Sequence, residues 1–151
     1  MPIEMNELFG IAGKVAVITG AGGVLGGNIA KHFMRQGAKV VAVDIRQEQL
    51  DKRVSELKQY GNEVIGVVGD VLDVASLGKL AGQVLSQWGK IDILLNIAGG
   101  NMPGATLEPE QHFYDMDIAC WEKVTGLNMN GTVYPLSLIH ISEPTRLRRI
   151  S

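Results

Sequence analysis

The sequence predicts an α/β fold, a doubly wound parallel sheet with helices on both faces. Short runs rich in Val and Ile alternate along the chain with longer segments whose apolar residues recur at the helical period. Each helical segment is followed by a glycine shortly before the next apolar run. Strand and helix therefore alternate, and this order favours parallel strands joined by right-handed crossovers.

Four apolar runs are expected to form the strands of this sheet. They are short and nearly continuous, which is typical of strands buried on both faces. In chain order they cover Lys14–Thr19, Ala38–Val43, Glu63–Val68 and Ile91–Leu95. Polar residues follow the last three runs, with Asp44 after the second, Asp70 after the third and Asn96 after the fourth.

Three helical segments lie between these strands, and each has an apolar face that would pack on the sheet. A glycine at the end of each segment is a common helix stop, because it adopts left-handed backbone. The first face contains Val24, Leu25, Ile29, Phe33 and Met34 and ends near Gly37; the second contains Leu50, Val54, Leu57 and Tyr60 and ends at Gly61; the third runs from Val74 to Trp88 and ends at Gly89.

The pattern changes after the fourth strand. Gly99–Asp117 mixes Gly and Pro with acidic and aromatic residues, which predicts a loop, and a loop of this length is usually functional. A helical pattern resumes over Ile118–Gly131, with Trp121, Val124 and Leu127 on one face. We therefore expect a sheet truncated after about four strands and the following helix, with the fourth strand left as an exposed apolar edge.

The last residues differ from the rest of the chain. From Leu136 they read LSLIHISEPTRLRRIS, with three Arg and one Glu, and Pro144 would interrupt a helix. This string resembles the read-through translation of a sequencing-library adapter, so residues 136–151 are predicted to be a non-native tail. The alternative is a natural basic tail that touches a membrane or a partner.

Composition limits the classes of protein that fit. The chain has 151 residues, 46% of them hydrophobic, which suits one domain with a buried core. A net charge of −2 gives no attraction to nucleic acid or to an anionic membrane, so neither is expected as a partner. The single cysteine, Cys120, excludes an internal disulfide, and Met1–Asn6 lacks the basic residues of a secretory signal. Both observations favour the cytoplasm.

The junction between the first strand and the first helix carries the strongest functional signal. It reads TGAGGVLGG from Thr19 to Gly27. A sharp turn into a helix directs free N–H groups and the positive helix end at one point, and glycines let a diphosphate approach the backbone. We expect a Rossmann-type dinucleotide site here, formed by Gly20, Gly22, Gly23, Val24, Leu25 and Gly26. The alternative is a tight turn that only packs the helix on the strand.

Two acids extend this predicted site. Asp44 lies 24 residues after Gly20, and an acid at about 20 residues from such a turn accepts hydrogen bonds from a ribose 2′-hydroxyl. It would repel a 2′-phosphate, so NAD is favoured over NADP, although Arg46 could receive that phosphate. Asp70 could accept the adenine amino group. Each acid could instead cap the helix that follows it.

Together these residues resemble the short-chain dehydrogenase/reductase family over residues 7–135, and residues 1–135 are assigned to the N-terminal part of its NAD(P)-binding domain. The family's motif is Thr-Gly-x-x-x-Gly-x-Gly. Thr19, Gly20 and Gly26 match it, whereas Val24 replaces the middle glycine, and Gly22 and Gly23 could supply the missing room. The resemblance implies an oxidoreductase that transfers hydride between a nicotinamide and an alcohol or ketone.

Three further segments of this sequence match motifs of the family, and the resemblance implies a role for each. Its Asn-Asn-Ala-Gly segment is Asn96-Ile97-Ala98-Gly99 here, which implies that Asn96, Ala98 and Gly99 stabilise the sheet and line the cofactor site. The pair Asp70-Val71 matches the residues that contact adenine. Asn128 matches the Asn of the family's Asn-Ser-Tyr-Lys tetrad, which supports a proton-relaying water.

A branch of the family is also indicated. The pair Val24-Leu25 and the segment AGGNMPGATLEPEQHFYDMD resemble the D-mannonate oxidoreductases, also called fructuronate reductases. The resemblance implies a sugar-acid substrate and a homo-oligomeric full-length parent. Two other readings stay open: a dinucleotide-binding module without catalysis, and an epimerase or dehydratase on the same fold.

The positions of the tyrosines predict that this chain alone does not catalyse the reaction of the family. In the family a Tyr transfers the alcohol proton, a Lys four residues later lowers its pKa, and a Ser orients the carbonyl. Tyr60, Tyr114 and Tyr134 are not followed by Lys at that spacing. The missing Ser, Tyr and Lys are expected after Asn128, in sequence absent from this chain.

The histidines and the cysteine do not indicate a metal site or a catalytic nucleophile. His32, His112 and His140 lack the spacing of a metal site, and no metal is expected. His112 is interpreted as a solvated loop residue and Cys120 as a packing residue.

Overall fold

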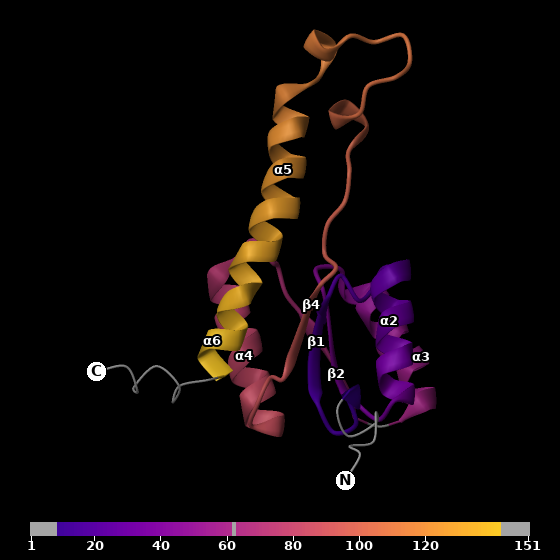
Figure 1. Ribbon diagram of the computed structural model, residues 1–151, viewed down its shortest axis with the longest axis vertical. Helices are drawn as coiled ribbons and strands as arrows, with labels where there is room; N and C mark the ends of the chain where they lie inside the picture. Colours follow the sequence, from indigo (N-terminus) through magenta and orange to yellow (C-terminus); the bar gives the residue numbers. More distant parts are fainter. Residues whose placement is uncertain (1–8, 62, 143–151) are drawn as a thin grey trace, which may run out of the picture.

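A parallel sheet forms the centre of the computed structural model, which describes residues 9–61 and 63–142 (Figure 1). Its strands are β1 (Val15–Thr19), β2 (Lys39–Asp44), β3 (Val64–Val68) and β4 (Ile93–Asn96), in the order β3-β2-β1-β4. Every pairing is parallel. The predicted α/β fold is therefore confirmed. The strand order reverses between β1 and β4, the position where such sheets bind ligands.

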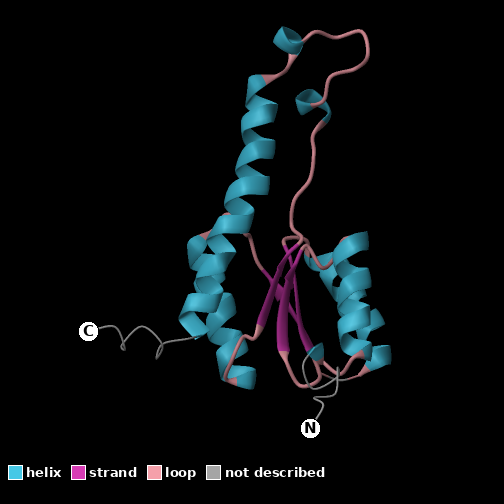
Figure 2. Ribbon diagram, in the orientation of Figure 1, coloured by secondary structure: helices cyan, strands magenta, loops and turns pink. Residues whose placement is uncertain are grey.

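Helices cover both faces of the sheet (Figure 2). On one face lie α2 (Val24–Arg35) and α3 (Gln47–Leu57), and on the other lies α4 (Val74–Trp88). Short 3₁₀ turns follow at Lys58–Tyr60, Pro103–Ala105, Phe113–Asp115 and Tyr134–Leu136. The predicted glycine stop is clearest at Gly89, which adopts a left-handed φ of 73° and donates to the Leu85 carbonyl.

The core has two halves, because successive side chains of a strand point to opposite faces. Val15 and Val17 of β1 pack with the α4 residues Leu77, Leu80 and Val84. Ile18 points to the other side and packs with residues of α2 and α3 that include Ala30, Leu50 and Leu57. β1 is completely buried and β2 almost completely, as predicted.

The other two strands differ from the prediction of burial on both faces. Burial alternates along β3, and β4 is only half-buried along its whole length. The physical reason is their place at the two edges of the described sheet. β4 is thus the expected apolar edge, although Leu94 still packs against the core.

The predicted apolar face of the first helix needs a correction at its beginning. Val24 and Leu25 are 80% and 63% exposed and contribute nothing to the core. They form the first turn of α2, beyond the strand tips, where the sheet offers no surface to cover them. The core-facing stripe is instead Ala30 and Met34, with Ile29 and Phe33 partly buried.

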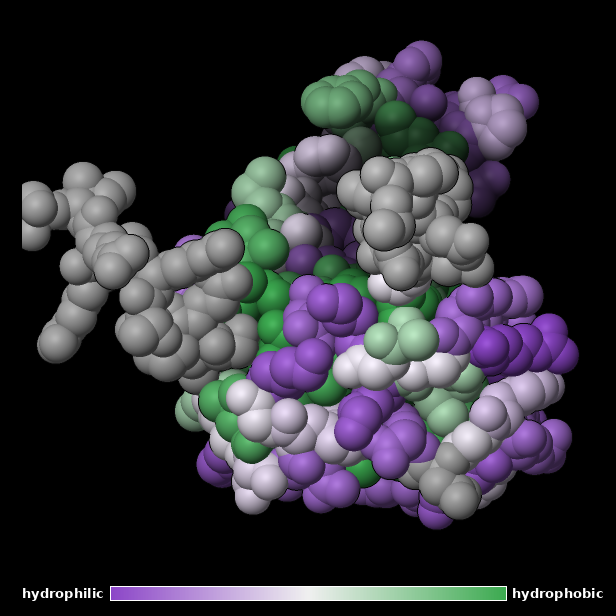
Figure 3. All heavy atoms as spheres, turned by 60° about the horizontal axis from the view of Figure 1, so that its bottom comes forward, coloured by the Kyte–Doolittle hydropathy of each residue, from purple (hydrophilic) through white to green (hydrophobic). Residues whose placement is uncertain are grey.

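The segment after β4 leaves the sheet and returns through the long helix α5 (Ile118–Val133), which projects beyond the strands (Figure 1). The predicted loop is confirmed apart from its short 3₁₀ turns. Trp121, predicted on a packed face, is 48% exposed, while Val124 and Leu127 are half-buried. In the space-filling view, hydrophilic residues dominate the lower face and apolar residues gather in a band beside it (Figure 3).

The first residues of the predicted tail pack on the domain. Helix α6 (Ser137–Ser142) places Leu138 in the core half around α4, where it is fully buried. The origin of this segment stays a prediction, and residues 143–151 with Pro144 lie outside the described part of the chain. Within the described residues, no helix combines the length and apolarity needed to cross a membrane.

Candidate functional site

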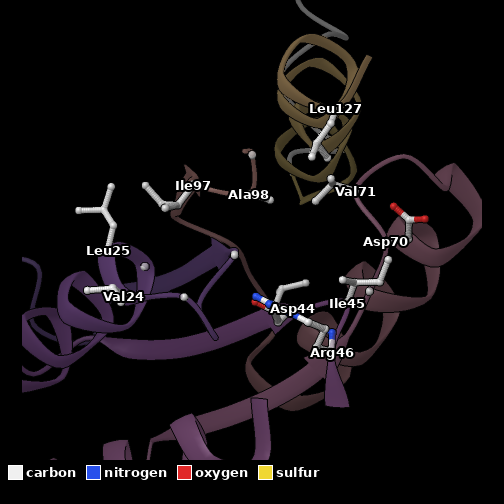
Figure 4. Close-up of a pocket in the computed structure, with 16 residues that line it drawn as sticks. Val24, Leu25, Asp44, Ile45, Arg46, Asp70, Val71, Ile97, Ala98 and Leu127 are labelled. Carbon is white, nitrogen blue, oxygen red and sulfur yellow. The ribbon is translucent and has the colours of Figure 1, made fainter. Parts of the chain in front are cut away.

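A crevice of about 480 Å³ opens at the carboxyl ends of the strands (Figure 4). It is surrounded by the turn after β1, the first turn of α2, the tips of β2 and β3, the segment after β4 and one residue of α5. The residues that line it are Gly20, Gly23, Val24, Leu25, Gly26, Val43, Asp44, Ile45, Arg46, Gly69, Asp70, Val71, Ile97, Ala98, Gly99 and Leu127. Most of the predicted site residues are therefore brought together.

The turn between β1 and α2 requires its glycines. Gly20 has a left-handed φ of 66°, and a Cβ there would lie 2.8 Å from the Ala98 backbone nitrogen. A Cβ on Gly26 would collide with the Gly20 carbonyl oxygen. Only glycine at both positions lets α2 start this close to the strand tips, and the turn passes directly under Ala98.

The start of α2 presents unpaired donors to the crevice. Gly23 is the N-cap residue, without a side-chain cap, and the first turn of α2 contains no acid. Among the described residues, the N–H groups of Val24, Leu25 and Gly26 have no acceptor, as expected for the first turn of a helix. Together with the positive helix end, they can bind an anion such as a diphosphate.

Asp44 meets this turn directly. Its carboxylate is 5% exposed; Oδ2 accepts a hydrogen bond from the Gly22 N–H at 3.0 Å. Oδ1 accepts from the Arg46 N–H at 3.0 Å and from Arg46 Nε at 3.4 Å. The N-cap of α3 is Arg46, without a side-chain cap, so the alternative role of Asp44 as that cap is wrong.

The predicted glycine contacts change accordingly. Gly22 is absent from the crevice lining, because its N–H group points to Asp44 and not to the open space. A Cβ on Gly22 would lie 2.7 Å from Asp44 Oδ2, so glycine is needed here to seat the carboxylate.

Asp70 and Val71 lie on the wall opposite Val24 and Leu25 (Figure 4). Asp70 Oδ1 accepts from the Leu72 N–H at 2.8 Å and does not cap α4. That cap is Asp73, whose side chain accepts from the Ala75 N–H, so the capping alternative for Asp70 is wrong.

Thr19 joins the end of β1 to the segment after β4. Its buried Oγ1 accepts from the N–H groups of Ile97 and Ala98, both at 3.1 Å, and donates to the Leu95 carbonyl at 3.4 Å. This hydroxyl therefore fixes the backbone of two crevice residues.

Asn96 points away from the crevice. Its Nδ2 donates to the Thr132 carbonyl of α5 at 3.3 Å, and Oδ1 is buried without a partner in the described structure. Asn96 links the sheet to α5, while the predicted lining role is met by Ala98 and Gly99.

Asn128 binds backbone rather than facing the crevice. Its Nδ2 donates to the carbonyls of Gly100 at 2.7 Å and Val124 at 2.8 Å, and Oδ1 accepts from the Gly100 N–H at 3.2 Å. A Cβ on Gly99 would lie 2.6 Å from this oxygen. Asn128 thus holds the segment after β4 against α5, and its role toward a water stays a prediction.

Sequence reasoning missed several lining residues. Ile45 follows Asp44 and is 61% exposed, a signal that could have been noticed as an apolar residue just after a strand. Leu127 was predicted on a packed helix face and instead covers the crevice from α5 (Figure 4). No local signal distinguishes these two uses of a half-buried Leu.

Two residues weighed earlier lie outside the crevice lining. His112 is exposed and stacks on Tyr114, with ring centroids 5.2 Å apart. The Cys120 thiol donates to Asp117 Oδ2 at 3.3 Å, and this hydrogen bond with the carboxylate raises the pKa of Cys120. A thiol kept protonated is a poor nucleophile, whereas the packing role of Cys120, which is half-buried and belongs to neither core cluster, stays a prediction.

Known proteins resemble this chain in sequence and in structure. A sequence profile of the short-chain dehydrogenases matches residues 14–140. The chain belongs to this family. Its sequence is 37% identical over 139 residues to an uncharacterized oxidoreductase, UxuB, of Bacillus subtilis, which covers 87% of this chain and 49% of the relative. It is 36% identical over 124 residues to the 2,3-dihydro-2,3-dihydroxybenzoate dehydrogenase of the same organism, covering 81% and 44%.

A solved structure with bound NAD shares the fold. It is provisionally named a D-mannonate oxidoreductase, from Haemophilus influenza, and it superposes with a TM-score of 0.82 at 30% identity. The match covers 91% of this chain and 53% of the other. The chain spans about half the length of the curated relatives it matches.

Proposed function

We propose that this chain is the dinucleotide-binding part of an NAD-dependent short-chain oxidoreductase. The observation that carries the proposal is the meeting of the glycine turn with Asp44 at the mouth of one crevice. A cluster of free N–H groups and a carboxylate on adjacent strand tips suits the two ends of an adenosine diphosphate.

The residues present fit this group. The N–H groups of Val24, Leu25 and Gly26 would bind the diphosphate, and Asp44 would accept from the adenosine ribose. The walls formed by Ile45, Asp70–Val71 and Leu127 would enclose the adenine, because they combine apolar surface with one carboxylate. The bound nicotinamide would supply the hydride acceptor or donor.

Asp44 also favours NAD over NADP. Its buried carboxylate places a fixed negative charge where the 2′-phosphate of NADP would lie. Arg46, whose side chain is 59% exposed, is already paired with Asp44 Oδ1, so its charge is partly compensated. The carboxylate is the buried and more fixed of the two charges, and it dominates the discrimination.

Calorimetric titrations with NAD and NADP test this proposal. The wild-type chain is expected to bind NAD at least about tenfold more tightly than NADP, which is about 1.4 kcal/mol. Asp44→Ala should weaken the binding of NAD and remove most of the preference for NAD over NADP. Glu48→Ala is the matched control, since it removes an exposed acid in the first turn of α3 and should preserve the preference. Equal affinities for both nucleotides before and after Asp44→Ala would contradict the proposal.

A sugar-acid substrate is proposed for the full-length parent, in the manner of a D-mannonate oxidoreductase. The support is the Gly-Gly-Asn-x-Pro-x-Ala-Thr segment and the similarity to the NAD-bound structure of that provisional name. Steady-state oxidation of NADH by the full-length parent with a panel of keto sugar acids and neutral ketoses tests it. Preference for the neutral ketoses would exclude this substrate class.

We also propose that the 151-residue chain by itself does not catalyse the reaction. Among the described residues that line the crevice there is no tyrosine, and Tyr114 lies 81% exposed on the loop before α5. The tyrosine that transfers the alcohol proton in this family is therefore not among the described lining residues. Turnover of NADH by the purified chain with any substrate of the parent would refute this.

A further inference from the structure

Arg53 lies in the middle of α3, and its guanidinium reaches the glycine turn. Its side chain is 22% exposed, low for an arginine on a surface helix. No part of it lines the crevice. Its burial therefore needs an explanation other than direct contact with a ligand.

The guanidinium binds the two glycine peptides of the turn. Nη2 donates to the Gly23 carbonyl at 3.2 Å and approaches the Gly22 carbonyl at 3.5 Å. Nη1 donates to Glu56 Oε2 at 2.6 Å, one turn further along α3. Arg53 is thus held by its own helix while it contacts residues thirty positions earlier in the chain.

Gly27 provides the space for this arrangement. A Cβ on Gly27 would collide with the Nε and Cζ atoms of Arg53. The guanidinium therefore lies against bare helix backbone, and its Nε is buried without a hydrogen-bond partner in the described structure. Burying an unpaired donor costs free energy, so the remaining contacts of this group must outweigh that cost.

We propose that Arg53 is a positioning residue for the diphosphate-binding turn, an inference that rests on the proposed dinucleotide function. In a trans peptide the C=O and N–H groups point in opposite directions. A donor on the Gly23 carbonyl therefore directs the Val24 N–H toward the crevice and polarises it. Glycine permits many backbone conformations at 22 and 23, and the contacts of Arg53 add to the hydrogen bonds of the Gly22, Gly23 and Gly27 N–H groups in restricting this turn before any ligand arrives.

Binding of NAD and of adenosine separates this role from a general effect on the fold. Arg53→Met keeps most of the side-chain volume but removes the charge and the hydrogen-bond donors. It is expected to lower the affinity for NAD by about tenfold, or about 1.4 kcal/mol. Adenosine lacks the diphosphate, so its affinity should stay within about twofold. Arg53→Lys should recover part of the NAD affinity. Lys52→Met is the matched control, because it removes the same charge from the exposed neighbour.

The structure of the turn can be tested without any ligand. Backbone ¹⁵N order parameters at Gly22, Gly23 and Val24 should fall from about 0.85 to below about 0.7 in Arg53→Met, but not in Lys52→Met. Gly27→Ala should produce the same loss by displacing the guanidinium, even though Ala favours a helix. It is the second variant should Arg53→Met fold poorly.

The two proposals fail in different ways. Unchanged order parameters in both Arg53→Met and Gly27→Ala would overturn the role of Arg53, whether or not the wild-type chain binds NAD. Equal losses of NAD and adenosine affinity would also overturn it. Absence of NAD binding by the wild-type chain, with the expected loosening of the turn in the variants, would reject only the nucleotide function and leave Arg53 as the residue that orders this turn.

Discussion

Replacing Thr19 with Val should weaken both the fold and the crevice. Valine has nearly the same shape, but it lacks the Oγ1 that accepts hydrogen bonds from the Ile97 and Ala98 N–H groups. Thr19 is completely buried, so no water replaces the hydroxyl without a rearrangement. Two backbone donors would lose their acceptor at the point where the segment after β4 crosses the glycine turn.

The size of the effect follows from these contacts. Each backbone group left without a partner costs about 1–3 kcal/mol. Ile97 and Ala98 are themselves only half-buried, which favours the lower part of that range. The loss of an acceptor for both N–H groups should therefore cost about 2–4 kcal/mol in Thr19→Val. Thr19→Ser keeps the acceptor and removes one methyl group, which costs only about 0.8 kcal/mol. For a chain of this size, the valine variant should melt roughly 4–16 °C lower.

Urea unfolding followed by tryptophan fluorescence measures the difference, since Trp88 packs against the core. The expected order of stability is wild type, then Thr19→Ser, then Thr19→Val, with unchanged dependence on urea concentration. A valine variant as stable as the serine variant would refute the reasoning, because it would show that the two N–H groups do not depend on the hydroxyl.

Three further outcomes follow from the geometry. Desolvation opposes the charge of Asp92, but hydrogen bonds from Lys90 and from the buried Val15 N–H outweigh it and lower the pKa of Asp92. The stability that the Asp92 carboxylate gives the fold is therefore complete above the ordinary carboxyl range and is lost as pH falls through the lowered pKa. The difference in stability between wild type and Asp92→Ala should shrink in that range, and a difference that stays constant down to about pH 2 would contradict this. Asp117→Asn keeps an acceptor that caps α5 but removes the charge beside Cys120, so iodoacetamide should alkylate the thiol faster at pH 8; an unchanged rate would show that the carboxylate does not raise the thiol pKa. Gly20→Ala should destabilise the chain by at least about 2 kcal/mol in urea unfolding, since the left-handed backbone and the clash with the post-β4 segment both oppose a side chain; wild-type stability would contradict the close approach.

Local pattern was sufficient for the order of strands and helices. Apolar spacing and glycine stops are properties of short segments, and they predicted β1, β2 and the end of α4 to within a residue or two. The meeting of Asp44 with the glycine turn was also predictable, because parallel strands end at the same edge of a sheet.

The errors arise where a choice depends on tertiary contacts. The expectation that Asp70 could cap α4 was a different kind of error, because Asp73 directly precedes Val74 and local spacing already favours it as the cap. Asn96 turns toward α5, far along the chain, and no spacing rule signals that direction. Arg53 looks like an ordinary surface residue of an amphipathic helix until the bare backbone at Gly27 is placed beside it.

The hydrogen bond between Gly22 and Asp44 has a consequence for protein engineering. Exchange of the acid for a smaller or basic residue is the obvious route to a chain that accepts phosphorylated adenosine, but it also removes the only described acceptor of the Gly22 N–H. If the proposed function holds, the choice between NAD and NADP and the geometry of the glycine turn therefore depend on the same carboxylate. Successful redesign should need paired changes at positions 22 and 44, with single exchanges losing affinity for both nucleotides.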